Sequence, residues 1–135
     1  MPIVTWSEDL SVKIKELDAQ HQELVAMINK MHDAMKQGKG KEVLGSIIDK
    51  MVEYTHKHFL SEEQLFSKHN YPEAGRHSRE HNDFVGKVAK FQRDLKAGNI
   101  TLTMDVITFL KEWLVTHIKG TDKKYTPFLN AKGVV

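Results

Sequence analysis

The chain has 135 residues, which suits one domain with its own hydrophobic core. It contains no cysteine, which excludes disulfides, thiolate zinc sites, iron–sulfur clusters and cysteine nucleophiles, and leaves nitrogen and oxygen atoms as metal ligands. The 20 basic and 18 acidic residues are spread along the sequence, and the formal charge is only +2. We therefore expect no nucleic acid partner.

The absence of targeting segments in the sequence predicts the location of the protein in the cell. They lack the basic region and the long apolar run of a secretory signal, and no apolar stretch approaches the ~18 residues that a membrane span needs. We expect a cytoplasmic protein without membrane insertion. Because the sequence contains no low-complexity segment and no long repeat, we also expect residues 1–135 to form a single domain.

Glycine and proline divide the chain into four long segments with helical patterns. These punctuating residues include Gly38, Gly40, Pro72, Gly98, Gly120 and Pro127. The predicted helices cover residues 17–37, 41–68, 73–97 and 103–119. An irregular arm with Trp6 precedes them, and a short helical tail with Tyr125 and Phe128 follows. Short loops join antiparallel neighbours, so the predicted fold is all-α: an up-down-up-down four-helix bundle.

Each predicted helix carries histidine on the face that its apolar residues mark as buried. His21, for example, lies between Leu17 and Leu24 in a stripe with steps of three and four residues. A longer stripe on the second segment includes Leu44, and His77 and His81 stack at i and i+4 on the third. The polar residues predicted to point inward are His21, His58, Glu62, His77, His81, His117 and Asp122.

This many polar groups in one core require a compensating positive charge. A buried carboxylate without a partner costs several kcal/mol or more, and metal ions supply the missing charge. Five imidazoles and two carboxylates exceed the coordination of one ion but suit two adjacent ions that share the carboxylates. The residue types alone leave iron, manganese and zinc open.

The spacings indicate which carboxylates can join the histidines. His58 and Glu62 are four residues apart and can point to the same place, whereas Glu63 is turned about 100° away. His117 and Asp122 are five residues apart, which an unbroken α-helix places on diverging faces. We therefore expect the helix to end or bulge near Gly120.

These residues occur in four short motifs in a fixed order. The motifs are Asp18-Ala19-Gln20-His21-Gln22, His58-Phe59 with Glu62-Glu63 and Leu65, Tyr71-Pro72 with His77, His81 and Phe84, and His117-Ile118 with Gly120-Thr121-Asp122 and Tyr125. The pattern resembles the hemerythrins, especially the bacterial ones, from Trp6 to Phe128. All seven ligand positions of that family pattern are matched at the expected spacings.

The resemblance implies a centre of two iron ions with a bridging oxo or hydroxo group, and reversible binding of dioxygen at one open iron. It assigns His77, His81 and His117 to one iron, His21 and His58 to the other, and Glu62 and Asp122 to both as bridges. The expected role is that of an oxygen carrier, for storage, delivery or scavenging, rather than an enzyme. Nitric oxide or small anions are further candidate ligands of the open iron, and a protein recipient or reductase is a candidate partner.

Residues beside the ligands have predicted roles of their own. An apolar pocket for dioxygen is expected to be lined by Leu24, Phe59, Trp113, Leu114 and Ile118. We hypothesise that Leu114, one turn before His117, gates the open site. Gln20 and Glu63 each adjoin a ligand in the sequence and are expected to orient ligand imidazoles.

Other functions use similar residues. The first alternative is an oxygen-sensing or redox-sensing module of a larger signalling protein. The second is a di-iron oxidase, peroxidase or nitric-oxide-handling enzyme that consumes a reductant. A haem-binding bundle would leave most of the inward-facing acids and imidazoles unexplained, and a dizinc site remains a fourth alternative.

Overall fold

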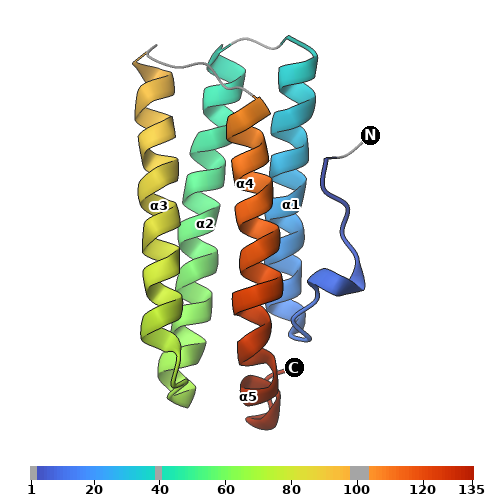
Figure 1. The fold of residues 1–135 in the computed structure, drawn as a ribbon, viewed down its shortest axis with the longest axis vertical. Helices are drawn as coiled ribbons and strands as arrows, with labels where there is room; N and C mark the ends of the chain where they lie inside the picture. Colours follow the sequence, from blue (N-terminus) through green and yellow to red (C-terminus); the bar gives the residue numbers. More distant parts are fainter. Residues whose placement is uncertain (1–2, 39–40, 98–103) are drawn as a thin grey trace.

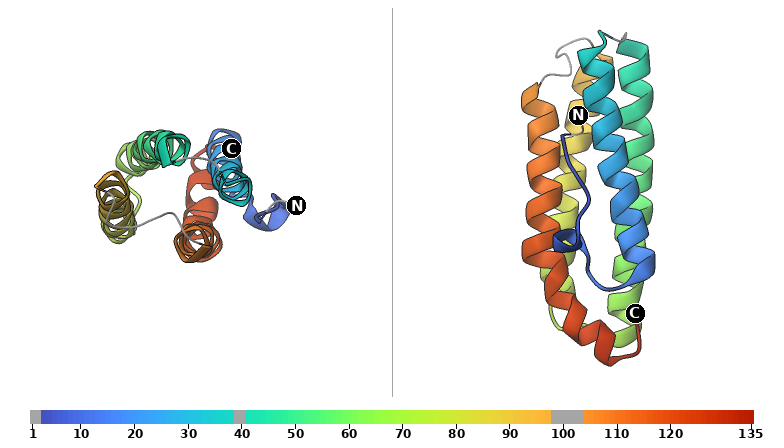
Figure 2. Two further views of the ribbon diagram at one scale, coloured as in Figure 1. Left: turned by 90° about the horizontal axis from the view of Figure 1, so that it is seen from above. Right: turned by 90° about the vertical axis from the view of Figure 1, so that its right-hand side faces the viewer.

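The computed structural model describes residues 3–38, 41–97 and 104–135, with only the backbone for residues 41–44 and 104–105. Its long helices are α1 (Lys15–Lys36), α2 (Lys41–His69), α3 (Ala74–Lys96) and α4 (Met104–Thr116). Successive helices run in opposite directions and stand side by side (Figures 1 and 2). This arrangement confirms the predicted all-α, up-down-up-down four-helix bundle.

Shorter segments lie at both ends of the bundle. The N-terminal arm runs along the outside of the helices and contains a single turn of 3-10 helix, η1 (Glu8–Leu10). After α4 come the π-helix η2 (His117–Thr121), the 3-10 turn η3 (Asp122–Lys124) and the short helix α5 (Tyr125–Ala131). Helix α5 closes one end of the bundle (Figure 2), so the predicted arm and helical tail are both present.

The predicted helix boundaries agree with α1, α2 and α3 to within two residues at each end. The fourth helix differs, because α-helical geometry stops at Thr116 instead of residue 119 and gives way to η2. The predicted start at residue 103, the glycines Gly40 and Gly98, and the side chain of Leu44 lie outside the described residues.

The turn between α2 and α3 fixes the register of the two helices that carry four of the inward-facing polar residues. Asn70 follows α2 with a positive φ of 56°, a left-handed conformation that asparagine tolerates better than most residues. The amide of Tyr71 donates a hydrogen bond to the carbonyl of Phe66 at 3.0 Å. This bond gives a partner to a carbonyl in the last turn of α2 that would otherwise have none within the helix. Pro72 then prevents the helix from continuing.

The start of α1 is tied to the N-terminal arm by Asp18. Its carboxylate accepts hydrogen bonds from the amide of Val12 at 2.8 Å and from the hydroxyl of Ser11 at 2.6 Å. A carboxylate in the first turn of a helix also interacts favourably with the helix dipole. The arm then buries Val12 and Ile14 against the bundle, which holds the start of α1 in place just before His21.

The apolar core runs the length of the bundle. Its large, fully buried side chains include Leu17, Ile28, Met31, Ile48, Met51, Ile107 and Leu110. Burial of one such side chain stabilises the fold by roughly 1.5–3 kcal/mol, so this core offsets the cost of holding polar groups at one level of the bundle. None of the helices in the described ranges has the length and hydropathy needed to cross a membrane.

Candidate metal centre

Seven polar side chains meet inside the bundle. Each is at most 4% exposed. They are His21 of α1, His58 and Glu62 of α2, His77 and His81 of α3, His117 of η2 and Asp122 of η3. They form two groups that share Glu62 and Asp122, with ligand atoms within 4.8 Å of one another in each group. The structure thus brings together all seven residues that the sequence pattern predicted to point inward.

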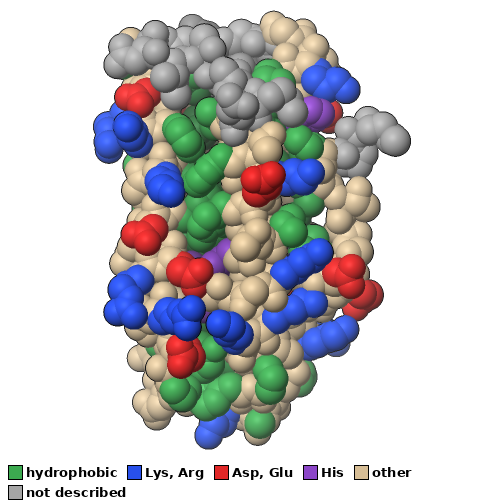
Figure 3. Space-filling view, in the orientation of Figure 1, with side chains coloured by type: hydrophobic (Ala, Val, Ile, Leu, Met, Phe, Trp, Pro, Cys, Tyr) green, Lys and Arg blue, Asp and Glu red, His purple; other side chains and the backbone are tan. Residues whose placement is uncertain are grey.

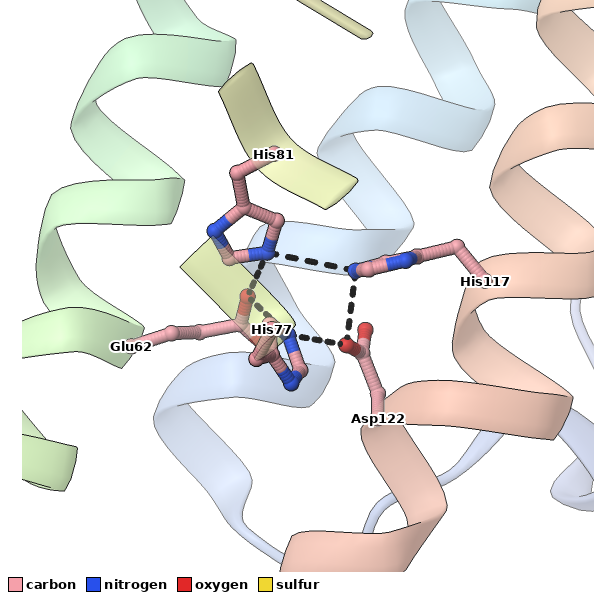
Figure 4. A group of neighbouring side chains, drawn as sticks. All are labelled: Glu62, His77, His81, His117 and Asp122. Carbon is pink, nitrogen blue, oxygen red and sulfur yellow. Dashed lines mark hydrogen bonds and ion pairs between the residues drawn. The ribbon is translucent and has the colours of Figure 1, made fainter. Parts of the chain in front are cut away.

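The larger group contains three histidines with both carboxylates (Figure 4). Oδ1 of Asp122 lies 2.8 Å from Nε2 of His77 and 3.0 Å from Nε2 of His117. Oε1 of Glu62 lies 3.1 Å from Nε2 of His81. Three imidazole Nε2 atoms therefore face two carboxylate oxygens, which is a donor set of the kind that binds divalent transition metals.

The smaller group contains His21 and His58 with the same two carboxylates. Oδ2 of Asp122 is 3.1 Å from Nε2 of His21, so the two oxygens of this carboxylate face different groups. Oε1 of Glu62 is 3.5 Å from Nε2 of His58. Carboxylates placed between two sets of imidazoles are suited to bridge a pair of metal ions.

A π-helical turn brings Asp122 onto the same face as His117. In an α-helix five residues turn the chain by about 500°, so the two side chains would point about 140° apart. In η2 the turn is wider, and the amide of Asp122 donates a hydrogen bond to the carbonyl of His117, five residues before it. The predicted bulge near Gly120 is confirmed.

The histidines of the centre keep both carboxylates ionised. Burial raises the pKa of Asp122, but His117, His21 and His77 outweigh it and hold that pKa well below its ordinary value. The pKa of Glu62 is also lowered, because His58, His77 and His81 outweigh both its burial and the repulsion from Asp122. Both carboxylates are therefore anionic at neutral pH.

The histidines respond to the same environment in different ways. Burial lowers the pKa of His58 to about 4, and the nearby Glu62 only partly opposes this. Burial also acts to lower the pKa of His77, but the carboxylates of Asp122 and Glu62 raise it to about 9. The centre thus combines neutral and cationic imidazoles around two anions, an arrangement that binding of metal ions would replace with neutral ligands.

Several atoms of the centre form close ion pairs that do not have the geometry of hydrogen bonds. Both ring nitrogens of His21 and of His77, Oε1 of Glu62, and both oxygens of Asp122 are buried and have no hydrogen-bond partner. These nitrogen and oxygen atoms therefore point toward shared positions that lie between them. Buried polar atoms of this kind are costly unless a ligand satisfies them, so the residues fit two metal ions.

Residues outside the seven fix the orientation of two imidazoles. The amide nitrogen of Gln20 donates to the hydroxyl of Ser61 at 3.3 Å, which directs Oε1 of Gln20 toward Nδ1 of His58 at 2.6 Å. Nδ1 of His58 is then the donor, and the lone pair of Nε2 points into the centre. The predicted contact of Gln20 with a ligand imidazole is present.

Glu63 contacts a second imidazole in a similar way. Its Oε2 atom lies 3.3 Å from Nδ1 of His81, and its Oε1 atom accepts a hydrogen bond from Ser78 at 2.8 Å. Because a carboxylate can only accept, Nδ1 of His81 is the donor here too. A carboxylate behind an imidazole increases the basicity of the nitrogen that faces a metal.

Two contacts were not predicted from the sequence. The hydroxyl of Tyr125 donates to Oε2 of Glu62 at 2.6 Å, and both residues are fully buried. Oε1 of Glu80 lies 3.9 Å from Nδ1 of His117 and accepts a hydrogen bond from Thr121 at 3.1 Å. The position of Tyr125 one turn after Asp122 was a usable signal, whereas the half-exposed Glu80 had no feature that set it apart.

An apolar cavity of about 10 Å³ lies beside the centre. Four of the five predicted pocket residues line it, namely Leu24, Phe59, Trp113 and Leu114. The ring of Phe59 stacks on His81 at 3.6 Å between centroids, and the ring of Trp113 stacks on His117 at 4.4 Å. The fifth, Ile118, is fully buried but is not among the residues that line this cavity.

Comparison with known proteins agrees with this geometry. Residues 12–129 match the model of a family described as the hemerythrin HHE cation binding domain. This chain belongs to the hemerythrin family. The family description names cation binding, and the seven buried side chains form a cluster suited to that role.

Relatives within the family cover nearly the whole chain. The bacteriohemerythrin of Methylococcus capsulatus is 34% identical over 132 residues, which is 97% of this chain and 100% of that protein. The bacteriohemerythrin of Stenotrophomonas maltophilia is 33% identical over 131 residues, which is 97% of this chain and 84% of that protein. A crystal structure of wild-type hemerythrin superposes with a TM-score of 0.89 at 32% identity and covers 93% of this chain and 96% of that one.

Proposed function

We propose that this member of the hemerythrin family binds dioxygen reversibly at a non-haem di-iron centre. The observation that carries the proposal is the pair of buried ligand groups that share Glu62 and Asp122 and lie beside an apolar cavity. Nitrogen and oxygen ligation with more imidazoles than carboxylates suits iron. When bound, two ferrous ions supply the two electrons that reversible uptake of dioxygen requires.

The ligand assignment follows the two groups. We assign His77, His81 and His117 to one iron and His21 and His58 to the other, with Glu62, Asp122 and a solvent-derived oxo or hydroxo group shared between them. The group with two histidines offers fewer protein ligands and is therefore proposed to leave the position that dioxygen takes. Nitric oxide and small anions would compete for the same position.

The surroundings of the centre favour binding over turnover. Phe59 and Trp113 cover imidazoles with aromatic faces, and Leu114 adds an aliphatic wall, so the cavity beside the centre excludes water. No carboxyl, ammonium or guanidinium group is among the described residues that line this cavity. A pocket without an acid slows the protonation and loss of reduced oxygen, which supports a carrier rather than an oxidase.

The extent of the domain and the class of its partners are also part of the proposal. The family match over residues 12–129 and the packing of the N-terminal arm on the bundle support a single hemerythrin-like domain over residues 1–135. A protein recipient or a reductase is the partner class that storage or delivery requires. A cytoplasmic location stays a prediction from the sequence.

One spectroscopic experiment tests the function. The iron content and visible spectrum of the reduced protein are measured without oxygen, after oxygen is added and after it is removed. We expect about two irons per chain, no haem spectrum, and a colour that appears with oxygen and disappears without it. A colour that decays only as a reductant is consumed would support an enzyme, and a protein free of iron would refute the proposal.

A further inference from the structure

A groove of about 430 Å³ leads from the protein surface to one of the proposed ligands. Its walls are Glu80 of α3 and Phe109, Glu112, Trp113 and Thr116 of α4, and it reaches His117. In the space-filling view a histidine side chain is visible at the surface between α3 and α4, with an acidic side chain next to it (Figure 3). Among the seven side chains of the centre, His117 is the most exposed, at 4%.

The groove has the chemistry of a path for a cation. It contains the carboxylates of Glu80 and Glu112 and the hydroxyls of Thr116 and Thr121, and the described residues that line it include no lysine or arginine. Lys87 contacts one wall of the groove, with its ammonium 5.4 Å from the centre of the Phe109 ring. Clefts lined by charges of one sign concentrate ions of the opposite sign.

The inner end of the groove holds an unsatisfied polar atom. Nδ1 of His117 is buried and has no hydrogen-bond partner, and the closest carboxylate oxygen, on Glu80, is 3.9 Å away. Thr121 holds that carboxylate by a hydrogen bond to the same oxygen. Polar groups therefore continue from the surface to the side of an imidazole whose Nε2 atom belongs to the centre.

Two further cavities lined by described residues lie near the centre, and each suits a cation less well. The small crevice beside His77 is lined by Arg76 and Lys124 as well as Glu73, so its positive charges oppose the entry of a cation. The apolar cavity beside Phe59 has Thr55 as its one hydroxylated lining residue among those described. Transfer of a hydrated divalent ion into such an environment is strongly unfavourable.

We propose that the groove between α3 and α4 is the entrance through which a divalent metal ion reaches the centre. Glu112 and Glu80 attract the hydrated ion, and His117 is the first imidazole that it meets. The small apolar cavity is left to dioxygen, so the metal and the gas enter by separate routes. This inference rests on the proposed metal centre.

Cobalt(II) uptake by the full chain tests the entrance. Co²⁺ is mixed with metal-free protein in a stopped-flow instrument, and its visible absorption follows uptake. Release from loaded protein is then followed after an excess of chelator is added. For Glu112→Gln we expect both rates to fall by the same factor, about threefold at low ionic strength, with unchanged affinity and stoichiometry. The difference should shrink as salt is added.

Equal slowing in both directions identifies a residue on the path, since a residue that stabilises the bound ion changes the affinity. Glu53→Gln is the matched control, because Glu53 is exposed on α2 outside the groove and its loss changes the net charge equally. Thr116→Arg places a cation in the groove from an exposed position and should slow uptake by about tenfold.

The outcomes separate the two proposals. If the wild-type chain takes up no cobalt, the metal centre itself is wrong. If the wild type takes up two ions and Glu112→Gln behaves like Glu53→Gln, the centre stands and the entrance is refuted. A Glu112→Gln protein that binds cobalt more weakly, with an unchanged rate of uptake, would also overturn the entrance.

Discussion

The hydrogen bond from Tyr125 to Glu62 makes a measurable contribution to stability, which Tyr125→Phe removes. Both residues are fully buried, the distance is 2.6 Å, and the other oxygen of Glu62 has no hydrogen-bond partner. A hydrogen bond to a charged group contributes about 1.5–3 kcal/mol, and the substitution leaves almost no cavity. We expect the metal-free protein to lose roughly 2 kcal/mol of unfolding free energy, or roughly 5–10 °C in Tm.

Urea unfolding at pH 7 measures this loss, and Tyr71→Phe is the matched control. Tyr71 is also largely buried and contacts the ring of Tyr125, but its hydroxyl has no hydrogen-bond partner among the described residues. Loss of that hydroxyl should cost less than about 0.5 kcal/mol. Equal losses in the two variants would show that the contact with Glu62 contributes nothing specific.

Four further predictions concern the same site. In the metal-free protein, the lowered pKa of His58, about 4 against 6.5, means that the unfolded chain takes up the proton first. His58 alone should therefore lower the free energy of unfolding by about 3 kcal/mol between pH 6.5 and pH 4, and the lowered pKa values of Glu62 and Asp122 act in the same direction. Urea titrations over this range measure the loss. The raised pKa of His77, about 9, acts in the opposite direction: its contribution is complete below pH 6.5 and is lost as the pH rises through 9. Leu114→Ala should enlarge the cavity, admit water and speed autoxidation several-fold at a cost of about 2–4 kcal/mol in stability; unchanged oxygen affinity and autoxidation would remove Leu114 as the gate. Gln20→Ala and Glu63→Ala should each weaken metal binding by about 10- to 100-fold in chelator competition, and unaltered metal retention would show that neither residue orients an imidazole.

The sequence was sufficient for the fold because the pattern of apolar residues is regular. His77 and His81 lie in a stripe with Phe84 and Val88 at helical steps, and all four are buried in the structure. Such a stripe specifies both the helix and the face that turns inward. The end of α2 and the start of α3 were also predictable, since Pro72 prevents one continuous helix there.

The seven inward-facing residues were predictable for the same reason, with one exception. Asp122 lies beyond the α-helical part of the fourth segment, and only the five-residue step from His117 indicated that the chain must bulge. In the structure the wide turn of η2 places His117 and Asp122, five residues apart, on the same face.

Contacts between segments far apart in the chain were the part that the sequence could not predict. Glu80 reaches His117 from another helix, and Thr121 holds it there. Neither residue differs in type or spacing from ordinary surface residues. Their proximity depends on how α3 and α4 stand relative to each other, which is a result of packing rather than of local pattern.

The most direct test of the central claim is a crystal structure of the iron-loaded chain with anomalous scattering measured at the iron edge. We predict two anomalous peaks inside the bundle, one among His77, His81 and His117 and the other beside His21 and His58, with Glu62 and Asp122 between them. A single peak, peaks at the surface or no peak in iron-loaded protein would contradict the account.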